Sequence, residues 1–175
     1  DVYKRQSSGS SAVLLALQSL VRSGDHIVAQ RSIYGGSFNL LSQTMPRQGV
    51  STTFVDTSDI ANIERAITEK TRAVYVETMG NPCSDLTDID VAAEIAHRHG
   101  IMLVVDNTFA TPYLLRPIEH GADLVVYSAT KFLGGHGTSL AGIIVDGGRF
   151  DYAASGRYPW LTAPVSYTHL RAHET

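Results

Sequence analysis

Residues 124–131 read Leu-Val-Val-Tyr-Ser-Ala-Thr-Lys, and the interpretation of the whole chain depends on them. The apolar run Leu124 to Tyr127 predicts a short strand, and two hydroxyl residues and Lys131 follow it directly. Lysine normally lies in water, so its place at the end of a buried strand requires an explanation. The simplest interpretation is a solvated loop whose hydroxyls favour a turn. The alternative is a Schiff-base lysine beside two hydroxyls, on Ser128 and Thr130, that donate to a phosphate.

The composition is that of an ordinary globular protein. Of the 175 residues, 43% are hydrophobic and 18% are charged, and the formal net charge is −3. This length suits one domain or the larger part of one, and this charge does not indicate nucleic acid or an anionic membrane as a partner. The histidines do not have the spacing of zinc ligands. The single cysteine, Cys83, excludes an internal disulfide and agrees with a cytoplasmic location.

Both ends of the chain are expected to be foreign to the protein. Residues 1–6 (DVYKRQ) resemble a translated sequencing adapter, and residues 165–175 (VSYTHLRAHET) resemble the same adapter at the other end. Ordinary terminal sequence is the alternative. We therefore expect the natural part to be residues 7–164, cut from a longer gene, and leave both ends out of the fold prediction.

Strand and helix patterns alternate along the chain, which predicts the α/β class with a mostly parallel sheet. A helix capped by Ser8 or Ser10 is expected first, and a capping box at Thr87 to Asp90 predicts another that stops at Gly100. His97 and His99 are expected on the surface of that helix. Other predicted helices are 37–45, ended by Pro46, one capped by Ser58 or Asp59, and one opened by Pro112; predicted strands are 26–29, 50–55, 73–76, 101–105, 124–127 and 140–145, with 148–164 irregular.

Polar clusters follow three of the predicted strands. They are Glu77 to Asn81, Asp106 to Thr108, and Ser128 to Lys131. Ligands of such sheets bind outside the carboxyl ends of the strands, so we expect the three clusters to line one pocket. Asp106 alone could be a simple cap at the end of a strand. An acid, an amide and a lysine at neighbouring strand ends are not needed by a purely structural sheet.

Pyridoxal phosphate is a ligand that could use each of these groups. The lysine could bind it covalently, and an aspartate could keep its pyridine nitrogen protonated, so that the ring accepts electrons. An amide could bond its 3′ oxygen, and hydroxyls with a helix N-terminus could hold its phosphate. An aromatic side chain could stack on the ring.

Several longer motifs resemble the Cys/Met-metabolism family of pyridoxal-phosphate enzymes. The resemblance covers nearly all of residues 7–164. It implies a three-layer sandwich with a mostly parallel mixed sheet, the large domain of fold-type I enzymes, of which residues 7–164 would be a part. The motifs are SSGSSA at 7–12, SIYGGSFNLL at 32–41, GNP at 80–82, DNTFATP at 106–112 and GADLVVYSATKFLGGHG at 121–137.

The same resemblance implies a role for each candidate residue. Lys131 would carry the cofactor and move protons, Asp106 would pair with the ring nitrogen, and Tyr34 would stack on the ring and act as an acid or base. Asn81 would contact the 3′ oxygen or the substrate carboxylate. The phosphate would be held by Gly9, Ser10, Ser128 and Thr130, with Thr108 beside the ring. Ser10 is smaller than the residue usual in the family, which costs little if its backbone N–H makes the contact.

Residues 149–164, RFDYAASGRYPWLTAP, resemble the O-acetylhomoserine sulfhydrylase branch of the family. The implied reaction is γ-replacement, in which sulfide or methanethiol replaces acetate and gives homocysteine or methionine. Cystathionine γ-synthase and methionine γ-lyase activities are the alternatives within the family. A further alternative is an inactive cofactor-binding fragment, because the family's amino-terminal phosphate contacts and its substrate-binding arginine are expected outside this chain. The family also implies a homotetramer.

Overall fold

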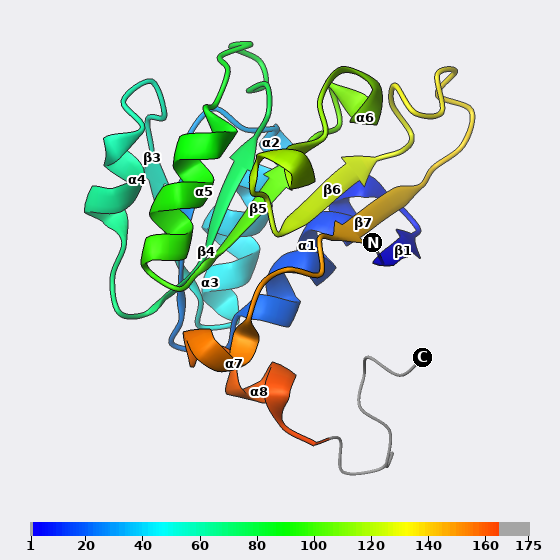
Figure 1. Cartoon of the computed structure of the whole chain (residues 1–175). Helices are drawn as coiled ribbons and strands as arrows, with labels where there is room; N and C mark the ends of the chain where they lie inside the picture. The colour runs from blue at the N-terminus through cyan, green and yellow to red at the C-terminus, as the bar shows by residue number, and fades with distance from the viewer. Residues whose placement is uncertain (1, 165–175) are drawn as a thin grey trace.

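The computed structural model describes residues 2–164 and contains one seven-stranded sheet with the strand order β1-β7-β6-β5-β4-β2-β3 (Figure 1). The strands from β3 to β6 pair in parallel, whereas β7 is antiparallel to both β6 and β1. The mostly parallel mixed sheet is therefore as expected. Its strands are β1 (Val2–Gln6), β2 (His26–Gln30), β3 (Ser51–Val55), β4 (Thr71–Glu77), β5 (Met102–Asp106), β6 (Leu124–Ser128) and β7 (Gly142–Asp146).

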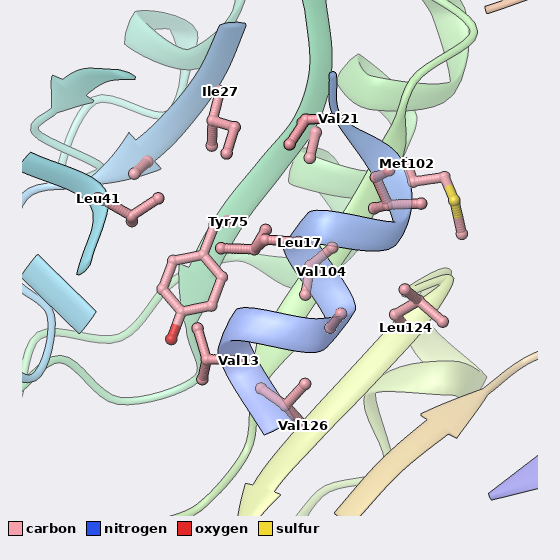
Figure 2. Packing of buried hydrophobic residues seen from close by; sticks show 14 of the residues in the cluster. Val13, Leu17, Val21, Ile27, Leu41, Tyr75, Met102, Val104, Leu124 and Val126 are labelled. Carbon is pink, nitrogen blue, oxygen red and sulfur yellow. The ribbon is translucent and has the colours of Figure 1, made fainter. Parts of the chain in front are cut away.

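Helices cover both faces of the sheet, which gives three layers (Figure 1). Helix α1 (Gly9–Leu20) packs Val13 and Leu17 against Tyr75, Val104 and Val126 of the central strands (Figure 2). Alternate residues of the same strands face the other way, toward α4 (Ala61–Ala66) and α5 (Ile89–Arg98). Because the central parts of β4, β5 and β6 are buried on both faces, residues 73–76, 102–105 and 124–127 are apolar without interruption up to the polar carboxyl ends.

The helix starts agree with the sequence in part. Ser8 caps α1, since its side chain accepts a hydrogen bond from the Ser11 N–H at 3.1 Å. The cap of α5 is Asp88, whose carboxylate accepts from the Val91 N–H at 3.1 Å, so the expected capping box at Thr87 is wrong. The N-cap of α4 is Ile60, so the expected cap at Ser58 or Asp59 is wrong, although the Asp59 carboxylate does accept from the Ala61 N–H at 3.2 Å.

Pro46 does not end the second helical segment, contrary to expectation. The segment runs through α2 (Gly35–Asn39), the π-helical turn η1 (Leu40–Thr44) and α3 (Met45–Arg47). Pro46 lies directly after the π-helical turn, where the regular α-helical hydrogen-bond pattern is already interrupted. Gly49, at φ 81°, follows the last turn.

Residues 148–164 are irregular only in part. They form two short helices, α7 (Tyr152–Ser155) and α8 (Pro159–Thr162), at the opposite end of the sheet from the loops that follow β5 and β6 (Figure 1). Tyr158 is fully buried between them: its hydroxyl accepts from the Met102 N–H at 3.0 Å and donates to the Arg72 carbonyl. An aromatic cluster surrounds it and anchors the segment.

His97 is exposed, as expected, and it also makes one polar contact with a buried residue. Its Nε2 lies 3.0 Å from the buried carboxylate of Asp123, which also accepts the Leu103 N–H at 2.8 Å. The corresponding contact of His99 is longer, with its Nε2 3.4 Å from the Glu64 carboxylate. Two further short helical turns, α6 (Thr111–Leu114) and η2 (Pro117–His120), connect β5 to β6.

The foreign origin of the two chain ends stays a prediction. Residues 2–6 form β1 and pair with β7, and the adapter-like origin of residues 1–6 is not tested by that pairing. The other adapter-like segment, 165–175, lies outside the described residues. Within residues 2–164, no helix has the length and apolar character needed to cross a membrane.

Candidate active site

All of the residues predicted for the site line one cavity of about 240 Å³ at the carboxyl ends of β4, β5 and β6. The three polar clusters therefore converge as expected, and the loop before α1 and the turn before α2 complete the wall. The predicted residues that line it are Gly9, Ser10, Tyr34, Asn81, Asp106, Thr108, Ser128, Thr130 and Lys131.

Asp106 is the acidic group of this cavity. One of its carboxylate oxygens accepts from the backbone N–H and the hydroxyl of Thr108, at 2.9 and 2.5 Å, and the other lies 3.4 Å from the Tyr75 hydroxyl. Burial raises the pKa of Asp106, and the hydrogen bonds from Thr108 and Tyr75 oppose that rise. No ion pair found among residues 2–164 includes Asp106. A cationic N–H group in the cavity would therefore bind this carboxylate favourably.

Two threonine hydroxyls connect neighbouring parts of the site. The Thr108 hydroxyl, which donates to Asp106, also accepts the Ser128 N–H at 2.8 Å, so it joins the ends of β5 and β6. The Thr130 hydroxyl accepts the Ala141 N–H at 3.1 Å and lies 3.3 Å from the Ala141 carbonyl. Both hydroxyls are thus engaged within the protein while they line the cavity.

The first turn of α1 lies directly against the end of β6. A Cβ added to Gly9 would lie 2.4 Å from the Cβ and 2.8 Å from the Cα of Ser128, so only glycine permits this approach. The N–H groups of Gly9 and Ser10 belong to the first turn and have no intrahelical acceptor. Together with the positive end of the helix dipole, they form a site suited to an anion.

Lys131 and Tyr34 lie at the mouth of the cavity. The Lys131 N–H donates to the Ser128 carbonyl at 3.0 Å in the turn after β6, and its side chain is exposed. Tyr34 precedes α2 and its ring is half exposed. Gly36 leaves room for that ring, because a Cβ there would lie 2.5 Å from Tyr34 Cε1.

Glu77 is the main residue of the cavity to which the sequence assigned no role. It ends β4 and is buried, and its carboxylate accepts the Tyr34 N–H at 2.8 Å. Burial raises its pKa to about 8, and the negative charges of Asp106 and Asp85 contribute to that rise. Its membership in the polar cluster after β4 was the only sequence signal. Other lining residues not predicted are Ser8, Val13, Ser37, Met79, Phe109 and Leu140.

A larger cavity, of about 520 Å³, lies beside the amino ends of β5 and β6. It contains none of the predicted site residues, and its central polar groups, His97 and Asp123, already bond each other. Ligands of parallel α/β sheets bind at the carboxyl ends of the strands, so the smaller cavity is the candidate active site. No group of three or more His, Cys, Asp or Glu side chains among the described residues could hold a metal ion.

A family model described as "Cys/Met metabolism PLP-dependent enzyme" matches residues 4–158. The chain belongs to this family. Its members depend on pyridoxal phosphate, so the resemblance carried by the motifs is confirmed.

Two similar proteins of this family are named for different reactions. The chain is 51% identical over 169 residues to O-acetyl-L-homoserine sulfhydrylase of Leptospira meyeri. This match covers 96% of this chain and 38% of the relative. The chain is 48% identical over 147 residues to L-methionine gamma-lyase of Porphyromonas gingivalis. This match covers 83% of this chain and 36% of the relative. The chain thus spans little more than a third of the length of either protein.

A solved structure of similar fold comes from Campylobacter jejuni. It is described as a putative O-acetylhomoserine (thiol)-lyase with N′-pyridoxyl-lysine-5′-monophosphate. Its TM-score is 0.81 at 36% identity, and the match covers 82% of this chain and 36% of that one. The fold-type I large domain is therefore confirmed as the architecture of the described residues.

The residues of this cavity fit pyridoxal phosphate. The partly buried Asp106 carboxylate suits a protonated ring nitrogen, and the close approach at Gly9 places helix N–H groups at the cavity, where they suit a phosphate. Lys131 lines the same cavity as both.

Proposed function

We propose that the full-length protein catalyses γ-replacement on O-acetyl-L-homoserine. Sulfide or methanethiol replaces acetate, and the product is homocysteine or methionine, a step of methionine biosynthesis. The observation that carries this proposal is the cavity that combines Lys131 with the partly buried carboxylate of Asp106, in a chain 51% identical to a sulfhydrylase over 96% of its length.

When bound, pyridoxal phosphate supplies an electron-accepting ring that stabilises negative charge developing on the substrate. Asp106 would hold the proton on the ring nitrogen, because a cation beside a buried carboxylate offsets the cost of its charge. Lys131 would bind the cofactor and, once released as a free amine, would take the proton from the substrate Cα. A second proton would leave Cβ, and Lys131 could take it only after passing on the first. Acetate would then leave Cγ, sulfide or methanethiol would add there, and protons would be returned to Cβ and Cα.

The other residues would bind and orient. Tyr34 would stack on the ring and act as an acid or base at the mouth of the cavity. Asn81 would contact the 3′ oxygen or the substrate carboxylate. Gly9, Ser10, Ser128 and Thr130 would hold the phosphate, and Thr108 would lie beside the ring.

Methionine γ-lyase activity is the second candidate, because the lyase from Porphyromonas gingivalis is nearly as similar, at 48% identity. Cystathionine γ-synthase activity stays a further alternative. The full-length protein would distinguish them by its substrates: O-acetylhomoserine with sulfide for the sulfhydrylase, methionine alone for the lyase, and cysteine as the thiol for the synthase.

We also propose a cytoplasmic homotetramer for the full-length protein. Exposed apolar side chains near the cavity support an assembly, since soluble monomers rarely keep such residues together in water. They are Phe109, Tyr113, Leu114, Phe132 and Leu140. The 175-residue chain alone is expected to bind the cofactor with weak or no turnover.

The first experiment is a titration of the purified chain with pyridoxal phosphate. A visible absorption band is expected, and Lys131→Ala should abolish it, whereas the matched control Lys70→Ala, at an exposed position, should keep it. Borohydride reduction and peptide mass spectrometry should locate the adduct on Lys131. Absence of the band in the unmutated chain would reject the cofactor site for this chain.

A further inference from the structure

Glu77 connects the two loops that face each other across the cavity. Its carboxylate accepts the Tyr34 N–H at 2.8 Å. The backbone N–H of Asn81 is near enough to the same carboxyl to lower its pKa. Tyr34 and Asn81 are two of the residues expected to contact the cofactor, and they lie 47 positions apart in the sequence. A single carboxyl group therefore bonds the backbone of Tyr34 and lies close to that of Asn81.

The backbone of Glu77 is fixed by a second set of bonds. Its N–H donates to the Gln30 side-chain oxygen at 2.8 Å, and Gln30 donates to the Asp85 carboxylate at 3.2 Å. Asp85 also accepts the Ser32 hydroxyl at 2.7 Å. The network thus joins the end of β2, the end of β4 and the loop after β4. It fixes the backbone from which the Glu77 side chain extends to the cavity wall.

Burying the Glu77 carboxyl costs desolvation free energy that an apolar side chain would not cost. Removing such a group from water is costly unless its oxygens accept hydrogen bonds, and an apolar residue would fill the same volume more cheaply. Glu77 is only 4% exposed, and the nearby acids Asp106 and Asp85 make its charge less favourable still. The position is explained if its oxygens are needed by the two loops.

We propose that Glu77 is a positioning residue, whose carboxyl sets where Tyr34 and Asn81 meet the ligand across the cavity. The proposal rests on the proposed cofactor-binding function, which gives Tyr34 and Asn81 their roles. It assigns Glu77 no direct contact with the reacting atoms.

The first test uses amide hydrogen exchange in the cofactor-free chain. Glu77→Met keeps the length of the side chain without acceptor oxygens, and Glu77→Gln keeps one acceptor oxygen. We expect Glu77→Met to speed exchange of the Tyr34 amide about tenfold, the effect of losing one hydrogen bond, and of the Asn81 amide by a smaller factor, with Val104 in the core unchanged. Glu77→Gln should stay within about threefold of the unmutated chain. Unchanged exchange in Glu77→Met would overturn the proposal.

The second test follows pH and separates positioning from space filling. The Tyr34 and Asn81 resonances should titrate together as Glu77 loses its proton, with a midpoint near pH 8. The titratable groups that face Glu77 are Asp106, Asp85 and Tyr75, with Lys131 and the Tyr34 phenol in the same cavity. The transition should vanish in Glu77→Gln and persist in Asp85→Asn. Its persistence in Glu77→Gln would refute the role, whether or not Glu77→Met folds.

Cofactor affinity provides the third readout. Glu77→Met should raise the apparent Kd for pyridoxal phosphate about tenfold, and Glu77→Gln should raise it less than threefold. Equal affinity in Glu77→Met and the unmutated chain would count against the proposal. If the unmutated chain shows no cofactor band, the proposed function fails, and the exchange and pH experiments still decide whether Glu77 holds the two loops.

Discussion

Two adjacent glycines allow the contact between Tyr34 and a ligand to be tested without removing the tyrosine. A Cβ at Gly36 would lie 2.5 Å from Tyr34 Cε1, 3.1 Å from Cδ1 and 3.2 Å from Cζ. A Cβ at Gly35 would have no neighbour within 4 Å. Both glycines lie in α2 and neither has a positive φ, so alanine is compatible with the backbone at either position.

The expected magnitudes follow from this geometry. Carbon atoms attract each other best at about 3.5–4.0 Å, so Gly36→Ala must displace the ring by about 1 Å. The ring is half exposed and can move, so the folding cost is small and is offset by a helix-propensity gain of up to about 1 kcal/mol. An aromatic stacking contact contributes about 0.5–1.5 kcal/mol, and its loss corresponds to an increase in Kd of about two- to twelvefold.

The assay is a titration of each variant with pyridoxal phosphate, paired with thermal unfolding of the cofactor-free chain. Gly36→Ala should bind the cofactor two- to twelvefold more weakly at nearly unchanged Tm, by the stacking energy given above. Gly35→Ala should bind like the unmutated chain and melt slightly higher. Equal affinities of the two variants would refute the contact between the Tyr34 ring and the cofactor.

Three further outcomes are expected. Gly9→Ala forces a Cβ to within 2.4 Å of Ser128 Cβ, and urea unfolding should show a loss of about 1–3 kcal/mol, the usual cost of overpacking; an unchanged free energy of unfolding would contradict the close approach. Tyr158→Phe leaves the buried Met102 N–H without its acceptor and should cost about 1–3 kcal/mol by the same measurement, with Tyr152→Phe as the milder control. For pH, the pKa of Glu77 is raised from 4.5 to about 8, so its contribution to stability is full below pH 4.5 and is lost as pH rises to about 8. The unfolding free energy of the cofactor-free chain should fall across that range and fall less in Glu77→Gln, and equal slopes would contradict the raised pKa.

The sequence was sufficient to predict the central sheet and the place of the site. Strands buried on both faces are continuously apolar, so the point where polar residues begin marks the carboxyl end of β4, β5 and β6. Because these strands are parallel and adjacent, their ends must meet at one edge. That is why Asn81, Asp106 and Lys131 could be placed in one cavity from sequence alone.

The features that the sequence did not predict depend on contacts between distant backbones and side chains. Glu77 acts on the N–H of Tyr34, 43 positions away, and any residue except proline at position 34 would offer the same donor. Tyr158 is ordered by the carbonyl of Arg72 and the N–H of Met102, which carry no sequence signature. The exposed His97 side chain contacts Asp123, a residue of the connection that leads into β6. No spacing along the chain encodes such pairs.

The hydroxyls expected at the phosphate are not equivalent in the folded chain. Thr130 uses its hydroxyl to hold Ala141, at the start of the strand that returns antiparallel to β6. Thr108 uses its hydroxyl to join Asp106 to Ser128. A group already bonded on both sides gains less from a new partner, since each added bond replaces an existing one. We therefore expect the phosphate to depend mainly on the first-turn N–H groups of α1, at Gly9 and Ser10, and on the Ser128 side chain that packs against them.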